Sequence, residues 1–250
     1  MIRALALAGL LLLAARHRPP GLDRLAVGEQ GRVAEIRSGD TLVLDSGLVV
    51  RLAGVEAPKG DEPYATDALQ AMRRLADGRV VRLLYGGARR DAYGRALAQV
   101  KLTGNGQWLQ GALLRQGAAR ARTWADNRAM AGELYEAEAY ARNRAIGLWR
   151  LPAYRVLTPV ETERADGFQI VEARVRRIGQ DGGGASLSFD GGFSADLDAK
   201  ASGEFKTAGK APEQLRGRLV RVRGWLRDGY DGPIVRLDHP EQVEVLKEKD

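Results

Sequence analysis

The chain has 250 residues, of which 44% are apolar and 28% are charged. That length is enough for one or two domains with cores of their own, and that composition is typical of a soluble globular protein rather than a disordered or multi-spanning one. The absence of cysteine excludes disulfides, thiolate metal sites and thiol nucleophiles. The only histidines, His17 and His239, stand at opposite ends of the chain, so a bound metal is expected to be a hard cation with oxygen ligands.

The net charge of +7 is unevenly distributed. Residues 1–150 contain 23 Lys and Arg against 15 Asp and Glu, whereas residues 151–250 contain 16 against 17. A basic excess confined to the first part predicts that this part meets a polyanion such as nucleic acid. A generally basic, solubilising surface is the alternative that charge alone leaves open.

The first 20 residues have the pattern of an export signal. Arg3 precedes an apolar run at residues 4–15, and an Arg-His-Arg cluster follows it. A run of 12 apolar residues is shorter than the roughly 20 needed to span a bilayer, but it suits the hydrophobic part of a signal peptide. We expect an exported protein, periplasmic or secreted, in which residues 1–20 are a signal peptide or an anchor that contacts the membrane through residues 4–15. A buried N-terminal helix is the alternative.

A strand meander is expected after residues 21–30, which have no clear period and are expected to link the leader to the first domain. Short β-rich runs alternate with turns built from Gly, Ser and Asp, and helical patterns follow. The expected strands are residues 33–36, 41–44, 48–52, 80–85 and 96–102, and the expected helices are residues 68–75, 108–117 and 129–143. This order predicts a mainly β, α+β fold, in which a five-stranded Greek-key barrel of the OB type carries packed helices.

Five short motifs occur in one order along this part of the chain. They are "SGDT" (38–41), "RLAGVEAP" (51–58), "DAYGRALA" (91–98), "LLRQGAAR" (113–120) and a closing "GLW". Each motif alone is weak, but their shared order resembles the staphylococcal nuclease (thermonuclease) family over residues 31–150. The resemblance implies an OB barrel, a nucleic-acid partner, no small-molecule cofactor, and hydrolysis of DNA or RNA that depends on Ca²⁺.

The resemblance also implies a metal site. Asp40, Glu56 and the main-chain oxygen of Ala57 fall where the family has its calcium ligands. Glu56 is one methylene longer than the aspartate of the family, and the flexible coordination of calcium tolerates this better than the strict octahedron of magnesium. For a lone carboxylate in a turn, solvation without any ligand is the alternative.

Arg51 and Arg95 match two arginines of the family that contact the phosphate being cleaved. A guanidinium suits this role because its planar fork donates two parallel hydrogen bonds to phosphate oxygens and stays charged. Tyr93 matches an aromatic residue that lines the nucleotide pocket. Surface charge for the arginines and core packing for Tyr93 are the alternatives.

Lys59 departs from the family, which has a glutamate at this position that is proposed to be the general base. A lysine with an ordinary pKa of about 10.4 is cationic at neutral pH, so we expect Lys59 to bind substrate phosphate instead. The nearest acids are Asp61 and Glu62, and we assign the role of base to Glu62. The contrary hypothesis is a non-catalytic OB module that binds nucleic acid or protein and has lost its general base.

The remainder of the chain predicts a linker at residues 151–167 and a second, smaller β-rich domain at residues 168–250. Apolar residues alternate with charged ones at 171–175 and 220–223, and a short helix is expected at 211–217. The order of these elements resembles a second OB-like barrel. Its near-neutral charge gives no sign of tight binding to nucleic acid. We expect the protein to be a monomer.

Overall fold

The structure of this chain is a computed structural model that describes residues 19–247. It divides into two compact units, Met1–Ala153 and Tyr154–Asp250. Residues 1–18 of the predicted export signal lie outside the described residues. Within the described range, no helix is both long enough and apolar enough to cross a membrane.

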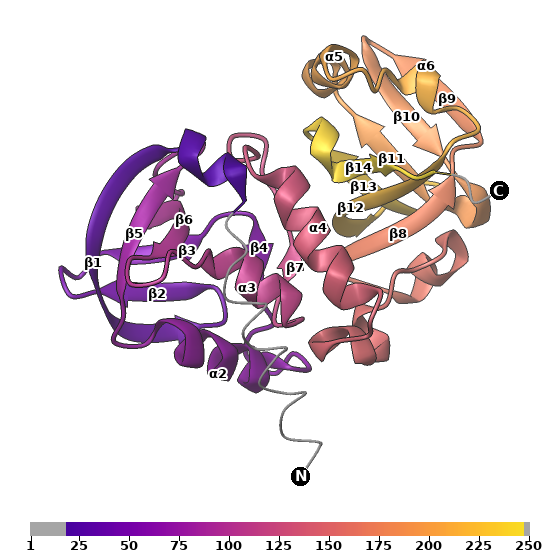
Figure 1. The fold of residues 1–250 in the computed structure, drawn as a ribbon. Helices are drawn as coiled ribbons and strands as arrows, with labels where there is room; N and C mark the ends of the chain where they lie inside the picture. Colours follow the sequence, from indigo (N-terminus) through magenta and orange to yellow (C-terminus); the bar gives the residue numbers. More distant parts are fainter. Residues whose placement is uncertain (1–18, 248–250) are drawn as a thin grey trace. The chain divides into compact units, whose positions relative to one another are not determined.

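The first unit contains a closed five-stranded barrel (Figure 1). Its strands are β1 (Ala26–Ser38), β2 (Thr41–Leu44), β3 (Val49–Leu52), β5 (Val80–Tyr85) and β6 (Ala96–Leu102). They hydrogen-bond in the order β1-β2-β3-β6-β5, and β5 pairs with β1 to close the ring. The β3–β6 pair is parallel and every other pair is antiparallel. The predicted α+β barrel of the OB type is confirmed.

The first strand begins earlier than the sequence indicated, because β1 starts at Ala26 inside the segment interpreted as a link. Its first residues pair with β5 across a bulge between Val27 and Gln30, which breaks the alternation expected of a strand. Val27 is accordingly 67% exposed. A side chain on Gly28 would meet the ring of Tyr85, with its Cβ only 2.3 Å from a ring carbon. Pairing with a distant strand, rather than the local pattern, makes this segment β.

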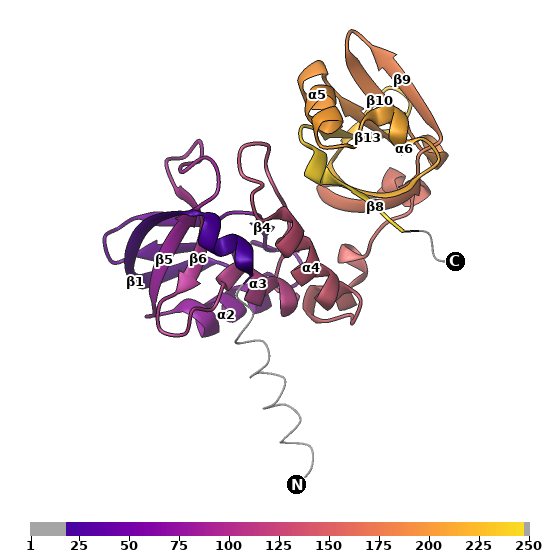
Figure 2. The ribbon, with the colours of Figure 1, turned by 45° about the horizontal axis from the view of Figure 1, so that its top comes forward.

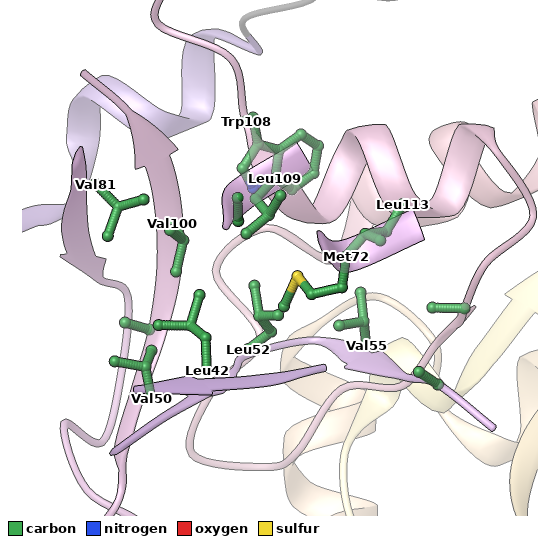
Figure 3. Packing of buried hydrophobic residues seen from close by; sticks show 14 of the residues in the cluster. Leu42, Val50, Leu52, Val55, Met72, Val81, Val100, Trp108, Leu109 and Leu113 are labelled. Atoms are coloured by element: carbon green, nitrogen blue, oxygen red, sulfur yellow. The ribbon is translucent and has the colours of Figure 1, made fainter. Parts of the chain in front are cut away.

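Three helices and a two-stranded ladder complete the first unit. They are α2 (Ala65–Ala76), α3 (Leu109–Arg115), α4 (Ala131–Arg142), β4 (Val55–Glu56) and β7 (Arg120–Ala121). The buried core includes Leu42, Leu52, Met72 and Leu113, and Figure 3 shows Met72 of α2 extending toward Leu52 of β3. Full burial of each such side chain stabilises the fold by roughly 1.5–3 kcal/mol. This packing fixes α2, and with it the loop between β4 and α2.

The second unit repeats the strand order of the first, and Figure 2 shows its strands with α5 and α6. Its elements are β8 (Phe168–Arg174), β9 (Arg177–Asp181), β10 (Gly184–Ser188), β11 (Ser194–Leu197), α5 (Ala199–Thr207), α6 (Pro212–Leu215), β12 (Leu219–Asp228), β13 (Pro233–Leu237) and β14 (Val243–Val245). The pairing order is β9-β10-β11-β13-β12-β8, with β11 and β13 parallel. β8 and β9 are the two end strands of this order, and only Val175 and Arg176 separate them in the chain. One continuous segment therefore supplies both end strands.

The predicted linker contains two 3₁₀ helices, Pro152–Tyr154 and Pro159–Arg164. Leu157 belongs to the buried core of the second unit, and its N–H donates a 2.9 Å hydrogen bond to the carbonyl of Ile170. Most of this segment is therefore part of the second unit.

Candidate active site

Asp40 lies in the tight turn between β1 and β2 and is fully buried. Its Oδ1 accepts hydrogen bonds from the hydroxyls of Ser38 (2.9 Å) and Thr41 (3.0 Å), and its Oδ2 accepts the main-chain N–H of Ala57 (2.9 Å). Gly39 permits this close approach, because a Cβ at that position would lie 2.7 Å from the Cβ of Ala57. The carboxylate therefore ties the turn to the loop that follows β4.

Arg51 of β3 connects the two acidic residues that the sequence predicted as metal ligands. Its Nη1 lies 2.9 Å from Asp40 Oδ2, and its Nη2 donates a 2.9 Å hydrogen bond to Glu56 Oε2. Arg51 pairs with Thr41 of β2 and Leu97 of β6, and it is only 4% exposed. The guanidinium is thus fixed by two strands and two carboxylates.

Glu56 reaches Arg51 because the chain reverses sharply between β3 and β4. Gly54 occupies the turn with φ +80°, a left-handed conformation that glycine adopts without strain. The buried side-chain amides of Gln99 and Gln110 donate to the carbonyl of Ala53 at 3.1 and 3.3 Å. Those two amides hold the turn in place, which positions the carboxylate of Glu56.

Arg122, which directly follows β7, is a site residue that the sequence did not reveal. Its N–H donates to the carbonyl of Gly54 (2.9 Å), and its Nη1 donates to Glu56 Oε2 (2.7 Å). The guanidinium carbons of Arg122 and Arg51 lie 5.1 and 5.7 Å from the ring centre of Trp124, within the range of cation–π attraction. The only signal in the sequence was the arginine and tryptophan of "RTW" two residues apart, in no motif of the resemblance.

Lys59 lies between the two acidic residues. Its Nζ is 3.0 Å from Asp40 Oδ2 and 3.0 Å from Glu56 Oε1, and 42% of its side chain is exposed. The expected contact of this lysine was a substrate phosphate. In the structure its ammonium forms ion pairs with both predicted metal ligands.

The charges of the cluster keep both carboxylates ionised. Burial raises the pKa of Asp40, but the charges of Arg51 and Lys59 outweigh burial and hold that pKa below its ordinary value. The pKa of Glu56 is also lowered, since Arg51, Lys59 and Arg122 together outweigh burial and the nearby charge of Asp40. Two carboxylates thus face three cationic side chains.

The same contacts test whether these residues fit a calcium ion. A cation shared by Asp40 and Glu56 would compete with Lys59 for Asp40 Oδ2 and Glu56 Oε1. Among the residues that the structure describes, no group of three or more His, Cys, Asp or Glu side chains could hold a metal ion. With Lys59 in this position, the residues do not fit a divalent cation.

The predicted general base, Glu62, lies beside this cluster in an exposed loop. Its Oε2 accepts the N–H of Lys59 (3.2 Å), and its own N–H donates to the carbonyl of Lys59 (3.0 Å). The structure therefore brings Glu62 to the main chain of Lys59. Asp61 is exposed in the same loop.

Arg95 and Tyr93 lie in the loop that leads into β6. Arg95 Nε is 2.7 Å from Asp91 Oδ2, and its guanidinium carbon is 5.3 Å from the ring centre of Tyr93. Tyr93 is 84% exposed, which excludes core packing. Arg95 directly precedes β6 and stands two residues before Leu97, the partner of Arg51 in the parallel β3–β6 pair. Its ion pair is with Asp91 rather than with the cluster around Arg51.

Comparison with known proteins agrees with this geometry. Residues 49–151 match the family described as "Staphylococcal nuclease homologue". The chain is 30% identical over 107 residues to "Staphylococcal-like nuclease CAN1" of Arabidopsis thaliana, a match that covers 43% of this chain and 31% of that protein. It is 37% identical over 73 residues to an "Uncharacterized endonuclease" of Escherichia coli O157:H7, covering 28% of this chain and 46% of that protein. The chain thus spans less than half the length of these curated relatives.

The matched segment contains every predicted site residue except Asp40. Asp40 precedes the match and reaches the same cluster through Arg51 and the N–H of Ala57. The order of the motifs, the closed barrel and the family match agree: residues 49–151 of this chain belong to the staphylococcal nuclease homologue family.

Proposed function

We propose that the first unit is a nuclease that hydrolyses phosphodiester bonds of DNA or RNA at the cluster around Arg51. One observation carries this proposal: the guanidinium groups of Arg51 and Arg122, from separate segments, converge on a single carboxylate oxygen of Glu56. Fixed guanidinium groups are suited to a phosphate, since they lose little conformational freedom on binding it. The basic excess of residues 1–150 and the nuclease names of the relatives support the same function.

The exposure of the cationic side chains separates their roles. The side chain of Arg51 is only 5% exposed, and its ion pairs hold the carboxylates of Asp40 and Glu56 in place. The side chains of Arg122, Arg95 and Lys59 are 23, 32 and 42% exposed and are accessible to a phosphate. These cations would stabilise the negative charge that develops on the phosphoryl oxygens during attack.

In the proposed reaction a water oxygen bonds to phosphorus opposite the leaving sugar oxygen. Glu62 accepts the proton of that water, the bond from phosphorus to the leaving oxygen breaks, and the leaving oxygen takes a proton from solvent. The side chain of Glu62 is exposed and can turn toward the phosphate from its hydrogen bond with the N–H of Lys59, while the main chain of the loop keeps its place. Placement of a general base is typically worth about 10²–10⁴ in rate.

Calcium dependence stays a prediction of the resemblance. When bound, a calcium ion would neutralise the phosphate and polarise its oxygens. It would need Asp40, Glu56 and the carbonyl of Ala57, and the ammonium of Lys59 now contacts both carboxylates. The reaction described above therefore uses only side chains of this protein and water.

A second candidate function is a non-catalytic module that binds nucleic acid or protein. The observation that favours it is again Lys59, which stands where the family has its proposed base and neutralises both acids of the cluster. Fold does not decide between these classes, because OB barrels serve both catalysis and binding. A binding module would retain nucleic acid without cleaving it.

The test is incubation of the full chain with single-stranded and double-stranded DNA and RNA, followed by separation of the products by size. We expect cleavage by the native protein and at least a tenfold lower rate for Arg95→Ala, since loss of one charge-stabilising donor typically costs about 10²–10³ in rate. Arg73→Ala, which removes an exposed arginine of α2, is the matched control and should cleave normally. Absence of cleavage of every substrate contradicts the nuclease proposal, and binding without cleavage supports the second candidate.

We also propose that the protein is exported. The support is the sequence alone: a basic residue and the apolar run at residues 4–15. Residues 1–30 fused to a reporter enzyme should direct it out of the cytoplasm. A reporter found wholly in the cytoplasm contradicts the proposal.

A further inference from the structure

We propose that the ammonium of Lys59 is a built-in replacement for a divalent cation, and that it excludes calcium from the site of the first unit. The inference rests on the proposed function, because it takes the cluster around Arg51 to be the phosphodiester site. It goes further by assigning the cation of that site to the protein itself.

The ammonium of Lys59 lies where a bridging cation would lie. Lys59 Nζ is equidistant, at 3.0 Å, from one oxygen of Asp40 and one oxygen of Glu56. These residues come from different elements, the β1–β2 turn and β4, and only their convergence creates a place for a cation between them. A divalent ion that bridges two carboxylates would use the oxygens that Lys59 already contacts.

Hydrogen bonds fix the main chain of Lys59. Its N–H donates to Glu62 Oε2 and its carbonyl accepts the N–H of Glu62, while the N–H of Ala57 is bound to Asp40. The loop is thus held on both sides of Lys59. An ammonium on so short a tether acts at an effective concentration of about 1 mM or more, so a free cation must displace it before it can bind both carboxylates.

The cluster already carries an excess of positive charge. Arg51, Lys59 and Arg122 already exceed the two carboxylates by one positive charge. A divalent cation entering this cluster would be repelled by its neighbours, all within a few ångströms. Removal of Lys59 leaves two arginines against two carboxylates and frees Asp40 Oδ2 and Glu56 Oε1 from their ammonium. A Lys59 variant should therefore gain an affinity for calcium that the native protein lacks.

The ammonium also offers a positive charge to the substrate. Because 42% of the Lys59 side chain is exposed, a phosphate can contact it without displacing the carboxylates. The site can then neutralise a phosphate in the presence of a chelator. Cleavage by the native protein would not require added metal.

Terbium luminescence provides a test that is independent of cleavage. Terbium ions occupy oxygen sites suited to calcium, and a nearby tryptophan sensitises their emission. Trp124 is suitably placed, since its ring lies 5.7 Å from the guanidinium carbon of Arg51. The full chain is titrated with terbium and then with competing calcium, in the native form and as Lys59→Met and Lys59→Ala. Lys101→Met, a lysine of β6, is the matched control.

We expect no saturable emission from the native protein or from Lys101→Met below about 1 mM terbium. Both Lys59 variants should bind terbium at least tenfold more tightly than the native protein, and added calcium should abolish their emission. Emission should also be absent from the two double variants, in which Lys59→Met is combined with Asp40→Asn or with Trp124→Phe. Circular dichroism checks that each variant is folded. No nucleic acid is present, so failure of the nuclease proposal leaves this test unaffected.

Three results would overturn the inference. One is native binding as tight as that of the Lys59 variants. Another is a failure of both folded variants to bind, because Lys59 would then not be what excludes the ion. If neither variant folds, calorimetric titration of the native protein with calcium decides: saturable binding that Asp40→Asn abolishes contradicts the inference, and absence of binding supports it.

Discussion

Arg122 Nη1 donates a 2.7 Å hydrogen bond to Glu56 Oε2, the same oxygen that accepts from Arg51. The pairing of β4 with β7 creates this contact, since Glu56 pairs with Arg120 and the N–H of Arg122 donates to Gly54. Two guanidinium groups on one oxygen fix both the carboxylate and the arginines. The site thus depends on a residue 66 positions further along the chain.

Arg122→Met should lower cleavage more than stability. The methionine keeps an apolar stem beside Trp124 but removes the guanidinium that we propose contacts the phosphate, so the rate should fall by about 10²-fold or more. Glu56 keeps its ion pairs with Arg51 and Lys59, so the free energy of unfolding in urea should fall by only about 1 kcal/mol. Arg73→Met on α2 is the control. An unchanged cleavage rate in folded Arg122→Met would remove Arg122 from the phosphate site.

Asp40→Asn should destabilise the first unit strongly. The variant removes the charge that compensates Arg51 in a buried position, and breaking a buried ion pair on one side typically costs about 3–5 kcal/mol. Asp45→Asn in the next turn, where the carboxylate accepts only a 3.2 Å hydrogen bond from an exposed main-chain N–H, should cost far less. The free energies of unfolding of the two variants in urea provide the comparison. Equal losses would contradict the central place given to Asp40.

Glu62→Gln tests the assigned general base. If Glu62 accepts the proton of the attacking water, its amide should reduce kcat by about 10²-fold or more while folding and nucleic-acid binding change little. Asp61→Asn in the same exposed loop is the matched control. Native kcat in both variants would refute the assignment and favour attack by water without a protein base.

Glu29→Gln should flatten the acid side of the stability profile. The hydroxyl of Tyr85 donates a 2.6 Å hydrogen bond to Glu29, and this bond, together with Arg90 and against the effect of burial, lowers the pKa of Glu29 from 4.5 to about 2. A depressed pKa contributes stability that is present above pH 4.5 and lost as the pH falls toward 2. The side chain is 40% exposed, so solvent screening limits the effect to about 1 kcal/mol or less.

Urea unfolding at several pH values checks this prediction. The native protein should lose more stability than Glu29→Gln between pH 4.5 and 2. Glu35→Gln, an exposed glutamate of the same strand, should follow the native profile. Parallel profiles for native protein and Glu29→Gln would show that the contact between β1 and β5 adds nothing measurable to the closure of the barrel.

The barrel could be predicted from the sequence because most of its strands are marked by residues close to them in the chain. Turn residues and short β-rich runs marked β2, β3, β5 and β6, and glycine marked the end of α2. The start of β1 was missed because its residues become β only by pairing with β5, whose partners lie more than 50 residues away. Local periodicity carries no information about such a pairing.

The site was predictable in its parts but not in its connections. The motifs located Asp40, Arg51 and Glu56, and the structure brings them together. Arg122 was not found because it joins the site through the β4–β7 pairing. The contacts of Lys59 depend on the meeting of a turn, a short strand and a loop, and no spacing along the chain shows that its ammonium would lie between two acids.

The most direct test compares cleavage of single-stranded DNA and RNA by the native protein and by Lys59→Glu, each in calcium and in chelator. The native protein should cleave at the same rate in both conditions, because Lys59 supplies the cation of the site. Lys59→Glu places a third carboxylate beside Asp40 and Glu56, so its cleavage should require calcium. Native cleavage that disappears in chelator and returns with calcium would contradict this account.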